Sequence, residues 1–535
     1  MTTWGLPEAV TELTVEALAD LMVRPSGRAL VGGEREERLR ARCGQGSGRI
    51  GKDEVTGAQQ LRRLTQAASR APQALPLLIS VNQEGGRLNA LDWPHVVQMP
   101  GSQALGAAAD SELAEQTGAA LGGQLRAVGM TWNLAPVCDL ASWPAAPAVG
   151  ARAVSSDPEL VARLTAGFVR GLQGEGVAAT AKHFPGLGGV RHDPHLAISV
   201  TERLLPGALL PFQAAVEVGV ASVMVGSHVV TEFEDCPALY SPRTVTGLLR
   251  DRLGFDRVIV SENLSIPAVH AAAGGIAQAA VRAVLAGVDV VMVDSEVSRG
   301  NQPGRMWEVG ARRRGQVVQA LVAAVRQGRI SRARLEVSAA RLLRMHARFG
   351  LAADSRQRPW QEANARAGEV AERLARQAVT VVRGRELLPL RLPASQAVIA
   401  VRVPVQGDRR ADSARHAPDV LPALLGEHHP AVLARRPGSR SFPAGSGAVI
   451  VYGYDSRPGP GAHVSQAAAE VARLKAAGHR VMQIALGDVD DLAGSAADVL
   501  IAAHSPHAAS LRAVAEVLFG QLEAAGVLPL SGAPW

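Results

Sequence analysis

The chain has 535 residues, of which 47% are apolar (AVILMFWYC) and 20% are charged. This much apolar material excludes a disordered or collagen-like chain, and the length corresponds to between two and four domains at roughly 150 residues each. The formal net charge of +7 would suit a nucleic-acid partner, but the basic residues are scattered among acidic ones and only 3% of residues are aromatic. We therefore expect no nucleic-acid partner.

The cysteines and the hydropathy pattern exclude further classes of protein. Cys43, Cys138 and Cys236 lie far apart, which argues against a disulfide framework or a four-thiolate zinc site. No run of about 18 apolar residues is present, and the N-terminal stretch lacks a basic segment followed by an apolar one. We expect a cytoplasmic protein without a membrane partner.

Short apolar, β-branched runs alternate with Ala/Leu-rich helical stretches between about residues 75 and 295. Continuous apolar strands that alternate with helices are typical of a parallel sheet covered on both faces. Six or seven such units over about 300 residues favour a closed (β/α)8 TIM-type barrel over an open sheet. The expected strands are 76–83, 130–139, 176–184, 220–229, 257–264 and 288–295, with 28–33 as a plausible earlier one.

Polar side chains cluster at the carboxyl end of each expected strand. On a (β/α)8 barrel this end carries the active site, so these side chains are expected to converge on one mouth. Any one of them could be a strand-end cap, but their common position favours a site. They are Asn82, Glu84, Asp139, Lys182, His183, His228, Glu262 and Asp294.

A second α/β pattern follows a helical stretch over 330–352 and a break. The sequence therefore predicts a barrel domain over 1–352, a linker and connecting helix over 353–378, and an α/β sandwich domain over 379–535. Within the sandwich, the acidic stretch 487–494 lacks the ligand spacing of a calcium loop and indicates a solvated helix start. The expected sandwich strands are 397–405, 448–454, 480–487 and 498–505.

The segment 181–199, AKHFPGLGGVRHDPHLAIS, is the densest chemical signal. Side chains at i and i+2 of an extended segment point the same way, so Asp193 could orient the imidazole of His195 for acid/base catalysis. A surface hydrogen bond between the two is the alternative for an isolated pair. A metal site built from His192, Asp193 and His195 lacks a second ligand cluster, so we expect no metal and no cofactor.

KHFPGLG followed by D-P-H resembles the signature of glycoside hydrolase family 3, in particular the bacterial β-N-acetylhexosaminidases of cell-wall recycling. The blocks PLLISVNQEGGRL (76–88), VGARAV (149–154) and SENLS (261–265) are similar to further blocks of that family. The resemblance implies a TIM-type barrel followed by an α/β sandwich. It also implies a retaining glycosidase that acts on terminal β-glycosides, in particular β-N-acetylglucosaminides of cell-wall fragments.

The resemblance also implies roles for individual residues. His195 corresponds to the acid/base, Asp193 to the group that orients it, and Glu262 to the position of the nucleophile. Lys182 is one of only three lysines among 56 basic residues, which fits a point-charge donor to sugar hydroxyls. The substrate-binding positions are occupied by Asn82, Arg152, Lys182 and His183.

Four positions depart from the family pattern. Glu262 replaces an Asp and lengthens the side chain by roughly 1.5 Å, where about 1 Å of misplacement can cost a hundredfold in rate. Asn82 replaces an Asp and cannot accept the same charge-assisted hydrogen bonds. Ala90 stands where a basic residue is expected, and Leu187 stands where a His is expected.

Three functions stay open on these residues. The first is a glycosidase in which Glu262 is a working nucleophile. The second is a catalytically impaired protein that binds a glycan or peptidoglycan fragment. The third is a β-glycoside phosphorylase, since a His acid/base carries no negative charge to repel phosphate.

Overall fold

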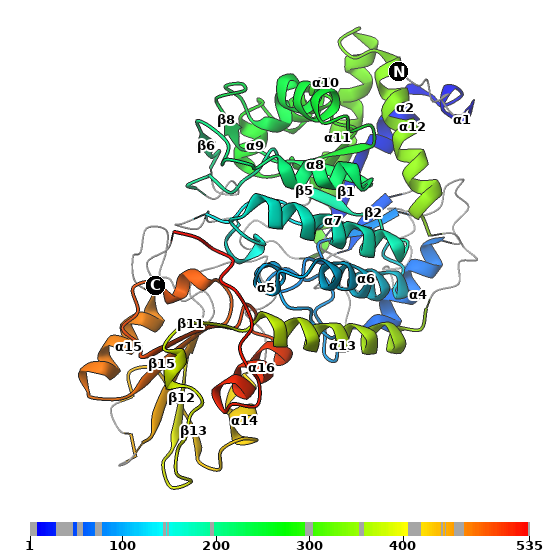
Figure 1. The fold of residues 1–535 in the computed structure, drawn as a ribbon. Helices are drawn as coiled ribbons and strands as arrows, with labels where there is room; N and C mark the ends of the chain where they lie inside the picture. The colour runs from blue at the N-terminus through cyan, green and yellow to red at the C-terminus, as the bar shows by residue number, and fades with distance from the viewer. Residues whose placement is uncertain are drawn as a thin grey trace.

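The computed structural model describes residues 8–27, 47–50, 57–69, 78–142, 146, 149–192, 197–294, 303–351, 358–404, 419–439, 442–443, 446–453 and 465–532. Figure 1 shows two α/β units, one above the other, with a long helix between them. Within the described ranges, no helix combines the length and the apolar content needed to cross a membrane.

The upper unit is built on an eight-stranded parallel sheet in the order β4-β3-β2-β1-β10-β9-β7-β5. Parallel bridges from Trp132 to Ala178 and from Val137 to Lys182 join the two end strands, so the sheet closes into a barrel. The strands are β1 (Val23–Gly27), β2 (Ser47–Ile50), β3 (Leu78–Val81), β4 (Trp132–Asn133), β5 (Thr180–Phe184), β7 (Ser222–Val225), β9 (Val258–Asn263) and β10 (Val290–Asp294).

The predicted barrel is therefore confirmed, and each of the six strands expected from 76–83 to 288–295 contains an observed strand. The expected strand at 28–33 lies outside the described residues. The first two observed strands, at 23–27 and 47–50, were not predicted, because VRPSG and SGRI contain no apolar run.

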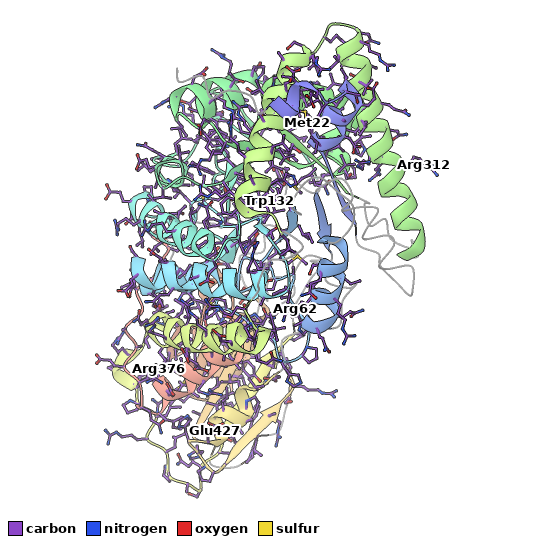
Figure 2. The ribbon with its side chains drawn as sticks, turned by 90° about the vertical axis from the view of Figure 1, so that its right-hand side faces the viewer. Met22, Arg62, Trp132, Arg312, Arg376 and Glu427 are labelled. Carbon is purple, nitrogen blue, oxygen red and sulfur yellow. The ribbon has the colours of Figure 1, made fainter. Side chains whose placement is uncertain are left out.

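Alternate strand positions fill the barrel interior, as the two-residue period of a strand requires. Leu78, Trp132, Met224 and Met292 belong to one buried cluster, whereas neighbours such as Ile79 pack outward against the helices. The indole Nε1 of Trp132 donates to the hydroxyl oxygens of Thr180 (2.7 Å) and Ser222 (3.0 Å). Figure 2 shows Trp132 within the barrel.

Helices surround the barrel, and two of them approach unusually closely. A Cβ at Gly171 would lie 1.8 Å from the carbonyl oxygen of Glu115, so glycine permits this contact between α6 and α7. The helices of this unit are α1 (Glu8–Thr11), α2 (Val15–Met22), α4 (Ala58–Ser69), α5 (Ser102–Ala108), α6 (Ser111–Ala127), α7 (Pro158–Gly174), α8 (Leu210–Glu217), the π-helix η4 (Arg243–Arg252), α9 (Pro267–Ala271), α10 (Ile276–Ala286), α11 (Pro303–Arg326) and α12 (Arg332–Phe349). Shorter elements are η2 (Gly150–Arg152), η3 (Ala238–Tyr240) and the paired strands β6 (Val200–Thr201) and β8 (Val229–Val230).

The lower unit is a six-stranded sheet in the order β11-β16-β15-β14-β12-β13, in which β11 alone is antiparallel to its neighbour. The four strands expected from 397–405 to 498–505 each contain an observed strand. Its strands are β11 (Thr380–Arg383), β12 (Val398–Val403), β13 (Val432–Arg435), β14 (Ala448–Gly453), β15 (Val481–Ala485) and β16 (Val499–Ala502). Its helices are η5 (Arg385–Leu387), α14 (Leu421–Gly426), α15 (Gln466–Ala476), η7 (Val489–Leu492) and α16 (Ala508–Leu518).

Helix α13 (Trp360–Ala378) lies between the two units and contacts α5 and α6 on one side and α16 on the other. Figure 2 shows Arg376, near its end, at this junction. One buried apolar cluster contains Leu121 of the barrel unit, Leu374 of α13 and Leu511 of the sandwich. The two units therefore share a continuous core.

A fully buried carboxylate, Asp289, ties the amino-terminal end of β10 to its neighbours. It accepts hydrogen bonds from the backbone N of Ile259 (3.0 Å), the hydroxyl of Ser338 (2.6 Å) and the guanidinium of Arg341 (3.1 Å). Arg250 and Arg334 also pair with it. Burial alone would raise the pKa of Asp289, but the three guanidinium groups outweigh it and hold that pKa below its usual value.

We predict that Asp289→Asn lowers the free energy of unfolding at neutral pH by about 3–5 kcal/mol, because it leaves buried cations without a counter-charge. The pKa of Asp289 is lower in the folded protein than in the unfolded chain, where it is about 3.9. The ionised carboxylate therefore stabilises the fold at pH values above about 3.9, and this contribution is lost as the pH falls toward the folded-state pKa. The gap between wild type and variant in urea unfolding should therefore narrow below about pH 4. The control is Asp256→Asn, whose exposed carboxylate lies 4.0 Å from Arg257; equal losses in both variants would contradict the prediction.

Candidate active site

A group of three charges, of which Glu84 and Lys182 are buried and Arg152 is partly exposed, forms where the loop after β3 meets β5. Arg152 donates from Nε and Nη2 to the two carboxylate oxygens of Glu84, each at 2.9 Å, and the Nζ of Lys182 lies 2.5 Å from the same carboxylate. Only 2% of the Glu84 and Lys182 side chains is exposed. Burial would raise the pKa of Glu84, but Arg152 and Lys182 outweigh it and keep that pKa far below its usual range.

The loop that carries Glu84 is fixed by its own sequence. Gly85 and Gly86 have φ of +86° and +58°, a conformation that side chains other than glycine rarely adopt. The side-chain oxygen of Gln83 accepts from the backbone N of Ala90 at 2.8 Å, and that of Asn89 accepts from the backbone N of Gly85 at 3.2 Å. The QEGG text therefore encodes a turn that directs Glu84 toward the barrel mouth.

The contacts of Glu84 define a role that its position in the sequence did not specify. Its bidentate partner is Arg152, 68 positions further along the chain. Lys182 also donates to the side-chain oxygen of Asn82 at 3.2 Å. The Glu84 carboxylate thus links Arg152 and Lys182, and Asn82 joins the group through Lys182. The sequence placed Glu84 among the strand-end side chains at the mouth, and its contacts make it a positioning residue for the two cations.

His183 is held by a second buried carboxylate. Its Nδ1 lies 2.7 Å from Asp139 Oδ2, and the backbone N of Leu187 donates to Asp139 Oδ1 at 2.7 Å. Burial would raise the pKa of Asp139, but the interaction with His183 outweighs it and lowers that pKa. An ionised carboxylate can only accept a hydrogen bond, so Asp139 keeps a proton on Nδ1 of His183 and thereby fixes the orientation of the ring. Its only sequence signal was its position at a strand end.

Glu262 lies at the end of β9 with 6% of its surface exposed, and its Oε2 accepts from the backbone N of Ser227 at 2.8 Å. His228, which follows Ser227 in the chain, is fully buried, and neither of its ring nitrogens has a hydrogen-bond partner among the described residues. Burial lowers the pKa of His228 to about 4, and Asp139, Glu262 and His183 all interact with its charge. A Cβ at Gly226, the residue before Ser227, would lie 3.4 Å from the Cβ of His183 and 2.9 Å from Nδ1 of His228. Because Glu262 is hydrogen-bonded to Ser227, it lies in the same neighbourhood as the Asp139–His183 pair.

The two other expected catalytic residues, Asp193 and His195, lie outside the described residues. The first part of their loop is packed in place, since Leu187 and Val190 belong to a buried cluster with Val149 of the Arg152 turn. In the part of the chain that the structure describes, no three His, Cys, Asp or Glu side chains are arranged to hold a metal ion.

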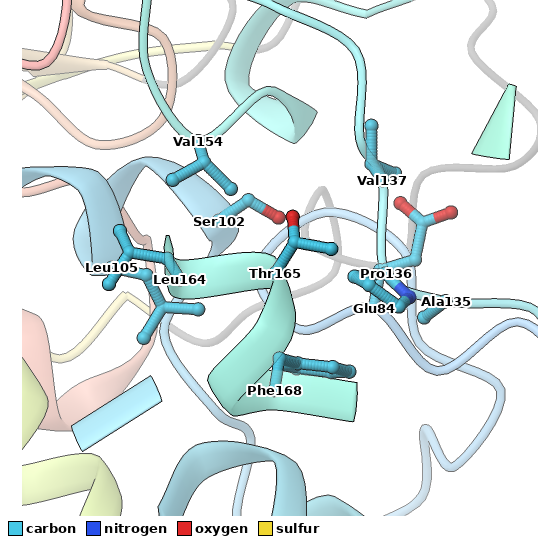
Figure 3. Close-up of a pocket in the computed structure, with 10 residues that line it drawn as sticks. All are labelled: Glu84, Ser102, Leu105, Ala135, Pro136, Val137, Val154, Leu164, Thr165 and Phe168. Atoms are coloured by element: carbon cyan, nitrogen blue, oxygen red, sulfur yellow. The ribbon is translucent and has the colours of Figure 1, made fainter. Parts of the chain in front are cut away.

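A small cavity lies beside Glu84 on the outer side of the barrel wall (Figure 3). Apart from Glu84, its polar side chains are Ser102 and Thr165, and the remainder are apolar. A mostly apolar lining excludes water from the side of Glu84 that faces the cavity, and it offers few groups that could bind sugar hydroxyls. The cavity is therefore better explained as part of the packing around the charged group than as a sugar-binding pocket. It is formed by Glu84, Ser102, Leu105, Ala135, Pro136, Val137, Val154, Leu164, Thr165 and Phe168.

Residues 46–345 match the family model of the glycosyl hydrolase family 3 N-terminal domain. A β-hexosaminidase of Stenotrophomonas maltophilia (strain R551-3) is 40% identical over 253 residues, which are 45% of this chain and 74% of the relative. A glycoside hydrolase family 3 β-N-acetylglucosaminidase from Paenibacillus sp. str. FPU-7 has a TM-score of 0.81 at 28% identity, covering 97% of this chain and 99% of that chain. A β-glucoside phosphorylase shares the fold, with a TM-score of 0.78 at 19% identity over 98% and 94% of the two chains.

We predict that Glu84→Gln lowers the free energy of unfolding by about 3–5 kcal/mol, because Arg152 and Lys182 lose their common counter-charge in a buried position. The matched control is Glu115→Gln, which removes an exposed carboxylate that also pairs with an arginine at 2.9 Å. An exposed pair of this kind contributes about 0–1 kcal/mol. Urea unfolding of both variants measures the contrast, and similar losses in the two would show that burial of the pair has no energetic consequence.

Proposed function

The chain belongs to glycosyl hydrolase family 3, and on that premise we propose that it hydrolyses terminal β-glycosides, with β-N-acetylglucosaminides as the substrate class. The observation that carries the proposal is the placement of a carboxylate, Glu262, on the backbone N of Ser227, next to Gly226, which packs against His183. The second support is the charged group on Glu84, which holds Lys182 of β5. Both features lie at the end of the barrel where this fold carries its active sites.

The proposed reaction is a double displacement with retention of configuration. Glu262 attacks the anomeric carbon while His195 gives its proton to the leaving glycosidic oxygen, so a glycosyl ester forms and the glycosidic bond breaks. Water then attacks the anomeric carbon of this ester and gives a proton to His195, and the bond between that carbon and the Glu262 oxygen breaks, which releases the carboxylate. Asp193 orients His195 throughout, and the Ser227 N–H holds the longer Glu262 side chain in place.

Substrate binding is assigned to Asn82, Arg152, Lys182 and His183. The ion pairs with Glu84 restrict the side chains of Arg152 and Lys182 before a sugar arrives, which lowers the entropic cost of binding hydroxyl groups. Asp139 does the same for His183. Asn82 is a neutral amide, so it can both donate and accept where the family pattern has a carboxylate.

Phosphate is a second candidate acceptor. A β-glucoside phosphorylase has the same fold, and a His acid/base would not repel a phosphate anion as a carboxylate would.

The cleavage of cell-wall fragments, a role in peptidoglycan recycling and a cytoplasmic location belong to the same proposal. So does the division of the chain into a catalytic barrel at 1–352, a linker at 353–378 and a sandwich at 379–535.

The test is nitrophenol release from a panel of aryl β-glycosides, led by the N-acetylglucosaminide, with and without phosphate. We expect turnover by wild type, a loss of about a thousandfold or more in Glu262→Gln, and a loss of about 10²–10⁴-fold in His195→Ala. Glu232→Gln, which removes the charge of an exposed glutamate, is the control and should match wild type.

Background rates for wild type on every glycoside would contradict the proposed glycosidase activity, and glycan binding would remain as the function. Full activity in Glu262→Gln would reject Glu262 as the nucleophile. Turnover that requires phosphate would replace hydrolysis by phosphorolysis.

A further inference from the structure

The sandwich touches the barrel beside the loops that carry the charged group on Glu84. The backbone N of Ser156, four residues after Arg152, donates to the carbonyl of Pro529 at 2.9 Å, and the backbone N of Val527 donates to the carbonyl of Ala107 at 2.9 Å. In Figure 1 the C-terminal segment, coloured red, runs from α16 to the barrel. The contact between the units thus reaches the Arg152 turn directly.

A second contact reaches the loop of Glu84. The Nε2 of His507, at the start of α16, donates to the carbonyl oxygen of Gly86 at 3.0 Å. The same oxygen accepts from the side-chain N of Asn89 at 2.9 Å. Gly86 also lies against Gly101, since a Cβ at Gly86 would lie 2.6 Å from the Cα of Gly101. The turn that directs Glu84 is therefore held from the barrel side and from the sandwich side.

A third contact comes from the stretch 487–494, which the sequence indicated as a solvated helix start. The helix start is confirmed, because η7 begins at Val489 with Asp488 as its N-cap. The expected solvation is wrong, because Asp490 and Asp491 are each only 2% exposed. Asp488 Oδ1 accepts from the side chain of Gln103 at 3.4 Å, and the backbone N of Val489 donates to the same side chain at 3.3 Å. A Cβ at Gly150 would lie 2.7 Å from Asp488 Oδ2, so the sandwich packs directly on the turn of Arg152.

We propose that these sandwich loops clamp the two barrel loops that present Glu84 and Arg152, and that His507 and Asp488 are positioning residues for the sugar-binding group. Only the expected effect of these contacts on KM and kcat rests on the proposed function. The clamp itself is a statement about the two barrel loops, which can be measured without a substrate. Neither His507 nor Asp488 needs to touch the sugar for this role.

The experiment compares full-length wild type with His507→Ala, His507→Gln and Arg512→Ala. The Gln variant keeps a side-chain N–H that can reach the Gly86 carbonyl. Arg512→Ala is the matched control, because Arg512 pairs with Glu372 across the α13–α16 contact at 3.0 Å, away from both barrel loops. Amide hydrogen exchange of residues 83–91 and 149–156 is measured for each protein, together with KM and kcat on the best aryl glycoside.

We expect His507→Ala to speed exchange in residues 83–91 and to raise KM by roughly fivefold, the size expected for the loss of one hydrogen bond, with a smaller change in kcat. His507→Gln should restore both values, and Arg512→Ala should leave both at wild-type levels. Wild-type exchange in His507→Ala, or the same change in Arg512→Ala, would overturn the clamp. If wild type hydrolyses no glycoside, the exchange result still decides the clamp, and only the proposed function fails.

Discussion

The ion pairs of Glu84 with Arg152 and Lys182 are the constraint on which the rest of the site depends. The carboxylate comes from the loop after β3, and its partners come from a separate turn and from β5. The buried charges of Glu84 and Lys182 would each be costly without a partner, and the partly exposed Arg152 adds a second counter-charge for Glu84. The loops cannot separate without that cost, so the group fixes their relative positions and presents cationic side chains at the barrel mouth.

The closed barrel makes this arrangement possible. The bridge from Val137 to Lys182 joins the two end strands at the level of the site, so Lys182 is both part of the closure and a member of the charged group. Asp139, two residues after Val137, meets His183 across the same junction at 2.7 Å. Strand pairing therefore sets the positions of the chemical groups, and the shared core with α13 and the sandwich supports the same region from below.

The sequence was informative wherever function follows a strand. Apolar runs predicted six barrel strands, and their carboxyl ends predicted the neighbourhood of Lys182, His183 and Glu262. The pairing of Glu84 with Arg152 could not be predicted from local pattern, because the two residues are 68 positions apart and meet only when the barrel closes.

The acidic stretch near Asp490 shows the opposite failure of local pattern. Its polarity suggested a solvated helix start, yet it is buried at a contact between the two units. A property of one segment cannot reveal which other segment will cover it. Long-range pairing and domain contact are thus the parts of this structure that sequence pattern left open.

The measurement that tests the central claim most directly is covalent trapping with an activated fluorosugar of the N-acetylglucosamine series. A retaining nucleophile forms a long-lived glycosyl ester with such a reagent, because the fluorine destabilises the oxocarbenium-like transition states of both steps while the activated leaving group speeds only formation of the ester. We expect intact-mass analysis to show one added sugar and peptide mapping to place it on Glu262. A label on another carboxylate, or no label under conditions of turnover, would contradict the assignment of Glu262 as the nucleophile.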